Sequence, residues 1–330
     1  MMDYEIFKEV VKEGFLSYMP KSYQDMEVRV VPVDKVNCKL DGLSLLAKDE
    51  KATISPTLYI NDMYEKYLRT EDLQETLREA AEAMDEVFRE AEIPPLDIST
   101  AKDNIIFQLV NTMQNEDMLK NLPHRDFQDL SIIYRWVVGV EQHGLSSVVI
   151  NNHVAESLGM GEEQLFKAAA ENTRRILPPA VKSMDEVIKE MFVADGMPPE
   201  VADMMIGEIP PERGMWIISN ERGTNGAASM LYENELHKLS VQLGTDLFIL
   251  PSSIHEVIAV PADDLEPEEL AQMVSEINMG QVALGERLSN QVYYYDKELR
   301  KLSLATDTPN KRLDGIVAEQ GFVYETKQSR

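Results

Sequence analysis

Residues 26–47, MEVRVVPVDKVNCKLDGLSLLA, contain two strand-like stretches, Met26–Val33 and Val36–Ala47, that only an Asp-Lys pair separates. A third strand-like stretch, Ala52–Ile60, follows after a short polar connection. Antiparallel strands can be joined by a tight turn, whereas parallel strands need a crossover of about a dozen residues or more. The short connections therefore predict an antiparallel meander.

Helical periodicity flanks this meander on both sides. Before it, apolar residues between Phe7 and Tyr18 fall at helical spacing, Asp3 is suited to cap the helix, and Pro20 ends it. After it, residues 61–92 predict two helices with a break near Thr70, which would cap the second. The second helix carries one continuous apolar stripe, formed by Leu73, Leu77, Ala80, Met84, Val87, Phe88 and Ala91.

The rest of the chain alternates between strand and helix patterns. Strands are predicted at residues 104–113, 130–140 and 146–150, and a helix at residues 162–176. From Met215 onward the pattern reads strand, strand, helix, strand, strand, helix. Gly223–Gly226 contains an Asn-Gly pair between two of these strands, which predicts a hairpin rather than a phosphate-binding loop.

One segment is suited to separate two domains. Asp195–Gly214 is rich in glycine and proline, although its apolar part, Val201–Ile206, is expected to pack. The sequence thus predicts an α+β protein with mainly antiparallel sheets and packed amphipathic helices, in two parts, residues 1–195 and residues 215–330.

Composition excludes several classes of protein. Fifty-eight acidic residues against 32 basic ones give a net charge of −26, which argues against direct binding of nucleic acid. No apolar run reaches the roughly 18 residues of a membrane helix, and the N-terminus lacks the pattern of a signal peptide, so a cytoplasmic protein without membrane association is expected. Cys38 is the only cysteine, and the histidines are scattered, so the sequence predicts neither a metal site nor a cofactor.

Asn151, Asn152 and His153 are the best candidates for an enzymatic site. They follow a predicted strand and precede a predicted helix, a place where loop ends can meet. Asparagine at a helix start is also the expected N-cap, and we give that structural interpretation more weight. Ser252–His255 places hydroxyls beside an imidazole, but a turn between paired strands explains it better than a hydrolase nucleophile, since no Gly-x-Ser-x-Gly motif is present.

The acidic excess concentrates in two segments. Glu75, Glu79, Glu82 and Glu86 belong to the stretch Glu71–Glu92, and a second acidic stretch is Asp263–Glu276. Such carboxylates keep an acidic protein soluble, which is the simpler interpretation. The alternative is a surface for a basic partner, including mimicry of nucleic acid, and this requires one contiguous acidic stripe on the folded protein.

Several stretches resemble a bacterial family of unknown function, DUF5688, and together they extend over most of the chain. They are residues 40–43 (LDGL), 55–60 (SPTLYI), 149–152 (VINN), 163–173 (EQLFKAAAENT) and 250–257 (LPSSIHEV). The resemblance implies a bacterial cytosolic protein without an assigned activity, and it assigns no functional residue.

Taken together, these patterns favour a non-catalytic binding or regulatory protein with an unidentified protein partner. The alternatives are an acidic nucleic-acid mimic or inhibitor of a basic partner, and an enzyme with its site at Asn151–His153.

Overall fold

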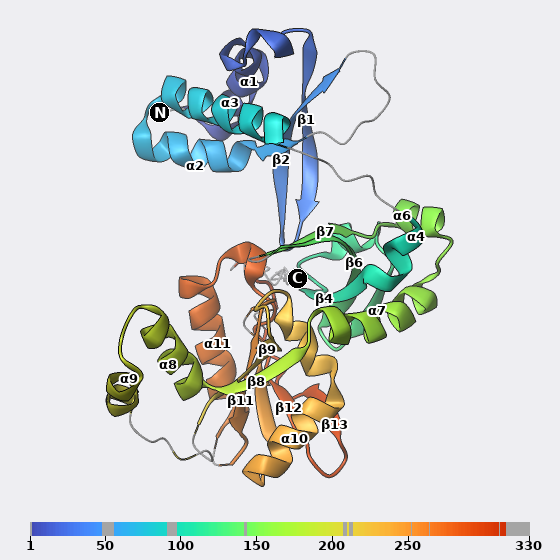
Figure 1. Cartoon of the computed structure of the whole chain (residues 1–330), viewed down its shortest axis with the longest axis vertical. Helices are drawn as coiled ribbons and strands as arrows, with labels where there is room; N and C mark the ends of the chain where they lie inside the picture. The colour runs from blue at the N-terminus through green and yellow to red at the C-terminus, as the bar shows by residue number, and fades with distance from the viewer. Residues whose placement is uncertain are drawn as a thin grey trace, which may run out of the picture. The chain divides into compact units, whose positions relative to one another are not determined.

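The computed structural model describes residues 2–47, 56–90, 98–141, 144–206, 210, 214–251, 253–263, 265–309 and 311–314. The chain divides into two compact units, Met1–Leu96 and Asp97–Arg330. The described residues form antiparallel sheets with helices packed on them, which confirms the predicted α+β class (Figure 1).

The first unit is built around the predicted meander. Its strands are β1 (Met26–Lys35), β2 (Cys38–Ala47) and β3 (Thr57–Tyr59), paired antiparallel in sequence order. Residues 35 and 38 are partners at the turn, so the hairpin is as tight as the sequence indicates. The predicted third strand is shorter than expected, because Ile60 already belongs to a helix, while residues 52–55 lie outside the described residues.

The described part of this unit also contains three α-helices. They are α1 (Tyr4–Gly14), α2 (Ile60–Thr70) and α3 (Leu73–Glu90), with short 3-10 turns η1 (Phe15–Tyr18) and η2 (Lys21–Tyr23). Asp3 caps α1 by accepting from the Ile6 N–H at 3.0 Å. The expected break near Thr70 is present, but the cap of α3 is Asp72, which accepts from the Glu75 N–H. Helices and sheet share one core, formed by Phe7, Val11, Phe15, Leu43, Leu45, Ile60, Met63, Tyr67, Leu77, Ala81 and Met84.

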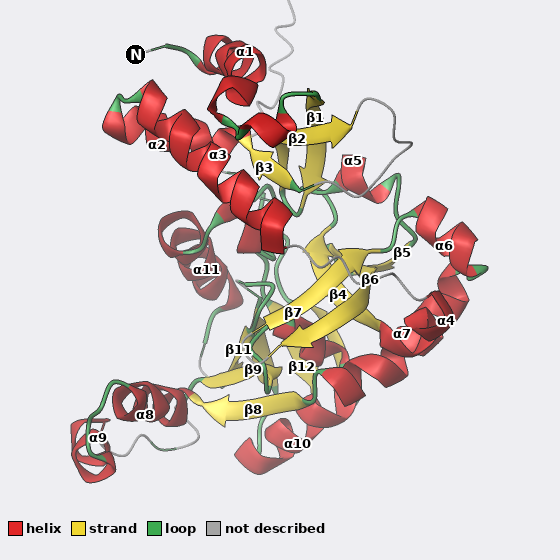
Figure 2. Ribbon diagram, turned by 45° about the horizontal axis from the view of Figure 1, so that its top comes forward, coloured by secondary structure: helices red, strands yellow, loops and turns green. Residues whose placement is uncertain are grey.

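The second unit contains two further antiparallel sheets (Figure 2). The smaller one has β4 (Ile105–Asn111), β5 (His124–Phe127), β6 (Leu130–Glu141) and β7 (Gly144–Val149). Its helices are α4 (Ile98–Ala101), α5 (Glu116–Leu119), α6 (Asn152–Leu158) and α7 (Glu162–Ile176), with the 3-10 turn η3 (Lys102–Asn104).

The larger sheet has the order β13-β12-β10-β11-β9-β8. Its strands are β8 (Pro179–Ser183), β9 (Trp216–Asn220), β10 (Leu247–Leu250), β11 (Val257–Pro261), β12 (Tyr293–Asp296) and β13 (Lys301–Leu304). Its helices are α8 (Met184–Ala194), α9 (Pro199–Ile206), α10 (Glu233–Leu243) and α11 (Pro267–Gln281), with 3-10 turns η5 (Gly226–Leu231) and η6 (Leu284–Glu286). One core joins both sheets of this unit, since it includes Ile105 and Tyr134 as well as Ile249 and Tyr293.

The expected boundary at Asp195–Gly214 does not coincide with the division between the two units. Strands β8 and β9 lie on either side of this segment in the sequence, yet they pair antiparallel from 179 opposite 220 to 183 opposite 216. The segment therefore belongs to the connection between two paired strands of one sheet. Helix α9 is part of this connection.

The predicted hairpin at Gly223–Gly226 is also absent, since the 3-10 helix η5 stands in place of its second strand. Asn225 adopts a left-handed conformation with φ 53°, and Gly226 packs directly against the backbone. A Cβ atom at Gly226 would lie 2.3 Å from the carbonyl oxygen of His255, so only glycine fits this close approach.

Candidate functional site

Asn151, Asn152 and His153 lie together at the start of α6, and all three are exposed. The Asn151 carboxamide accepts from the Val154 N–H at 2.8 Å, which is the geometry of an N-cap. The Asn152 N–H donates to the carbonyl of Asn121 at 3.0 Å. The contacts of this turn thus anchor a helix start, and they hold no imidazole against a nucleophile or carboxylate among the described residues.

A carboxylate–guanidinium pair that the sequence did not indicate lies at the start of α7. Arg125 on β5 donates two hydrogen bonds of 2.9 Å to Glu162, and the Tyr134 hydroxyl donates to the same carboxylate at 2.5 Å. Burial raises the pKa of Glu162, but the bonds from Arg125 and Tyr134 outweigh it, and the pKa lies below its ordinary value. The Arg125 guanidinium also stacks 3.8 Å from the centre of the Phe166 ring. This arrangement ties a strand to a helix.

The hydroxyls and imidazole near residues 250–257 also have a structural role. The Ser219 hydroxyl donates to the carbonyl of His255 at 2.8 Å, and the Ser253 hydroxyl accepts from the His255 N–H at 3.0 Å. The imidazole Nδ1 of His255 accepts from the Asn225 N–H at 3.3 Å, and its Nε2 lies 3.6 Å from Glu286. Ser252 lies outside the described residues. The hydroxyls of Ser219 and Ser253 therefore form hydrogen bonds with backbone groups. This agrees with the predicted turn and not with a serine nucleophile.

The acidic residues of α3 are partly ion-paired. Glu75 pairs with Arg78 on the same helix, and Glu79 pairs with Lys66 of α2 beside a cavity of about 240 Å³. Glu82 and Glu86 are exposed and form no ion pair within the described part of the chain. Glu92 and Asp264, at the two acidic stretches, lie outside the described residues.

The two acidic stretches fall in different units, so each forms a surface of its own unit. Within the first unit, a cation from a neighbouring helix interrupts the row of carboxylates. Such interleaving is typical of a solvated protein surface.

The most unusual surface of the second unit is the helical hairpin of α8 and α9. Helix α8 follows the edge strand β8 and begins with a capping box, in which Ser183 and Glu186 bond to each other's backbone N–H at 3.2 and 3.0 Å. Gly196, with φ 92°, turns the chain toward α9. An ion pair between Lys189 and Asp203 joins the two helices. Figure 2 shows the hairpin extending outward from β8.

A cavity of about 700 Å³ lies between β8 and this hairpin, within the size range of small-ligand sites. It is lined by Val181, Lys182, Glu186, Lys189, Glu190, Val193, Ala194 and Pro199. Lys182 is bonded to Glu190 at 2.6 Å, and Lys189 is paired as described above. Carboxylates therefore neutralise the charges of both lysines. Val181, Val193, Ala194 and Pro199 line the cavity with apolar side chains.

The hairpin exposes three methionine side chains to solvent. The exposed fractions are 85% for Met204, 64% for Met205 and 61% for Met191. Val193 and Val201 are exposed as well, while Ala202 is fully buried. The expectation that Val201–Ile206 packs thus holds for one face of α9 only. We call the exposed side chains of Met191, Val201, Met204 and Met205 the methionine face.

The helical hairpin is strongly acidic. Residues 184–206 contain six acidic residues and one lysine. Asp185, Glu186, Asp195 and Glu200 form no ion pair with other described residues. An apolar surface rimmed by uncompensated charge of one sign is typical of a protein-docking site.

The fold and this hairpin define an α+β protein of antiparallel sheets that carries an acidic helical hairpin with exposed apolar side chains. The chain belongs to the Family of unknown function (DUF5688), which it matches over residues 4–297. This confirms the resemblance derived from the sequence. Comparison with the curated proteins and with the solved structures finds no match.

Two further findings concern the described residues. Among the helices in the described ranges, none combines the length and the apolar character needed to cross a membrane. No group of three or more histidine, cysteine, aspartate or glutamate side chains there is arranged to hold a metal ion.

Proposed function

We propose that this protein is a non-catalytic binding protein of the bacterial cytosol, and that the methionine face of α8 and α9 docks its partner. The observation that carries the proposal is the exposure of three methionines on one helical hairpin beside a cavity of about 700 Å³. Methionine side chains are flexible and polarisable, so they adapt to the apolar face of another protein.

The charge of the hairpin indicates the chemistry of the partner. Four carboxylates of the hairpin are not ion-paired within the described residues, whereas both lysines at the cavity already are. A basic amphipathic helix supplies what is missing, because it presents apolar side chains to the methionines and cations to the carboxylates. The partner class is therefore a protein segment of this kind.

A labelled synthetic helix of leucine and lysine, with all leucines on one face, tests the proposal by fluorescence anisotropy. We expect the full-length protein to bind it, and Met204→Asp together with Met205→Asp to weaken binding about tenfold, equivalent to about 1.4 kcal/mol. Leu299→Asp is the matched control, since Leu299 is exposed at a different site, after β12. Equal affinities of the two variants would contradict the proposal.

The other functions predicted from the sequence have less support. Mimicry of nucleic acid stays a prediction, and the pairing of Glu75 and Glu79 with cations argues for a solvated surface instead. An enzymatic site at Asn151–His153 also stays a prediction, and the capping role of Asn151 leaves its carboxamide engaged with backbone.

A further inference from the structure

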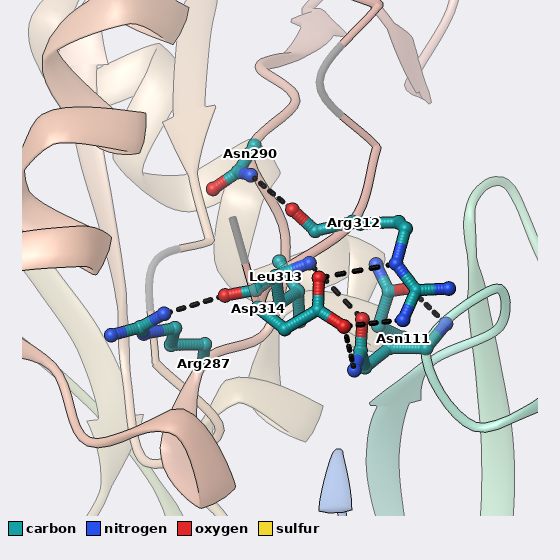
Figure 3. Close-up of polar contacts among 7 residues, drawn as sticks. Asn111, Arg287, Asn290, Arg312, Leu313 and Asp314 are labelled. Carbon is teal, nitrogen blue, oxygen red and sulfur yellow. Dashed lines mark hydrogen bonds and ion pairs between the residues drawn. The ribbon is translucent and has the colours of Figure 1, made fainter. Parts of the chain in front are cut away.

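The described residues that follow β13, 306–309 and 311–314, are held by side chains rather than by strand pairing. Side chains from two parts of the second unit contact the backbone of this segment: Gln114 from one part, and Arg287, Asn290 and Gln291 from the stretch before β12. We call them the clamp. Figure 3 shows Arg287 and Asn290 directed at the backbone of Arg312 and Leu313.

At two positions of the segment, Thr308 and Leu313, the clamp forms hydrogen bonds with both the backbone N–H and the backbone carbonyl. The carboxamide of Gln291 accepts from the Thr308 N–H at 3.0 Å and donates to the Thr308 carbonyl at 3.2 Å. At Leu313, the N–H donates to Gln114 at 3.2 Å, and the carbonyl accepts from Arg287 at 2.5 Å. Asn290 donates to the intervening carbonyl of Arg312 at 3.2 Å. These contacts recognise a polypeptide backbone independently of its side chains.

Two side chains of the segment add selectivity. Leu313 is fully buried, so this position requires an apolar residue. The Asp314 carboxylate accepts from the Gln114 carboxamide at 3.3 Å and from Arg312 at 3.1 Å. The preferred ligand is thus a peptide segment with leucine followed by an acidic residue.

Buried polar side chains hold the clamp residues in position. Asn290 and Gln291 are both 2% exposed, and Asn278 donates to the Asn290 carboxamide at 2.8 Å. The Asn278 carboxamide oxygen is buried without a hydrogen-bond partner among the described residues. Buried carboxamides are costly to leave unsatisfied, so these side chains require an occupant that supplies backbone donors and acceptors.

The family match separates the clamp from its occupant. Residues 4–297 are matched, and they contain every clamp residue and none of the residues 306–314. We propose that the clamp is a binding site for a peptide with a Leu-Asp pair, and that residues 306–309 and 311–314 occupy it in this chain. This inference is independent of the methionine face, because it concerns other residues.

The test measures exchange of the occupant in the full-length protein. The probe is a labelled peptide with the sequence of residues 306–314, TDTPNKRLD. The tethered segment competes with the probe at high effective concentration, so we expect weak binding to the natural sequence. Leu313→Asp weakens the tethered competitor, and we expect it to raise the affinity for the probe at least tenfold.

Two controls identify the site of binding. Adding Gln114→Ala to Leu313→Asp removes a clamp side chain and is expected to reverse the gain. A probe with its own leucine replaced by aspartate is expected to bind no tighter to the variant than to the natural sequence. A Leu313→Asp protein that stays folded by circular dichroism and binds the probe no better than the natural sequence overturns the proposal.

A second measurement covers a variant that fails to fold. In the protein of natural sequence, excess unlabelled peptide is expected to accelerate hydrogen exchange of the Thr308 and Leu313 amides, because displacement frees them from Gln291 and Gln114. Unchanged exchange at both amides under a large excess of peptide overturns the proposal as well.

Discussion

The methionine face and the clamp invert the usual distribution of polarity in opposite ways. On α8 and α9, large apolar side chains such as Met204 are exposed to solvent, while around β12 the carboxamides of Asn290 and Gln291 are buried. Folding alone favours neither arrangement. Apolar side chains that stay exposed contribute no hydrophobic stabilisation, and buried polar groups cost free energy unless they are hydrogen-bonded.

The difference between the two regions lies in whether a ligand is already present. The clamp holds a segment of its own chain, and its carboxamides are satisfied by that segment's backbone. Nothing in the described residues covers the methionine face. The first region is therefore expected to contribute strongly to stability and the second weakly, and the predictions below test this ordering.

The largest effect is expected in the clamp. Gln291→Ala removes the bonds to both backbone groups of Thr308 and to the Thr306 hydroxyl, and leaves buried polar groups unsatisfied. We expect the free energy of unfolding, measured in urea, to fall by about 3 kcal/mol. Gln272→Ala is the matched control, because Gln272 is exposed on α11 and bonds only to Glu276 at 3.0 Å among the described residues. A comparable loss in both variants would show that the clamp bonds are not specially stabilising.

A smaller effect is expected from the carboxyl group of Asp129, which accepts hydrogen bonds from Ser289 and Tyr293 just below the clamp. Burial raises the pKa of Asp129 above its ordinary value of 3.8, although Ser289, Tyr293 and the charge of Lys311 oppose the rise. Because the folded state favours the protonated form, this group stabilises most fully below pH 3.8 and less as the pH rises through the folded-state pKa.

Comparison with Asp129→Asn isolates this contribution, since the variant cannot titrate at that position. The difference in unfolding free energy, natural sequence minus variant, is expected to decrease as the pH rises from about 4 toward neutrality. Urea unfolding at a series of pH values measures it. A difference that increases with pH would mean that the hydrogen bonds, and not burial, dominate at Asp129.

The distance in sequence between contacting residues explains what the sequence could predict. The meander of β1 to β3 and the cap at Asp3 depend on neighbours in the sequence, so local patterns sufficed for them. The sequence did not predict the pairing of β8 with β9. Glycine and proline between the two strands are equally typical of a linker between domains and of a connection within one sheet. The hairpin expected at Gly223–Gly226 was wrong because the close approach to His255 is a tertiary contact.

The clamp depends most strongly on contacts between residues that are far apart in the sequence. Gln114 and Leu313 are 199 residues apart in the sequence, and glutamine and asparagine in a polar stretch carry no recognisable spacing. The candidate Asn151 was correctly given a capping role as the simpler interpretation, since that role needs only the next three residues. The methionine face was visible as an apolar stretch at residues 201–206, but its exposure could not be read from composition.

The smallest effect is expected on the methionine face itself. Met204 is 85% exposed, so Met204→Ser removes little buried apolar surface and should change the free energy of unfolding by less than about 0.5 kcal/mol. Ala202 lies two residues earlier on the same helix and is fully buried, and Ala202→Asp should cost more than about 2 kcal/mol, because it introduces an unpaired charge into a packed site. The pair separates the two faces of α9 within a single helix, with urea unfolding as the measurement. If Met204→Ser destabilised the protein as much as Ala202→Asp, the methionines would be part of the folded core in solution, and their exposure could no longer be attributed to a docking role.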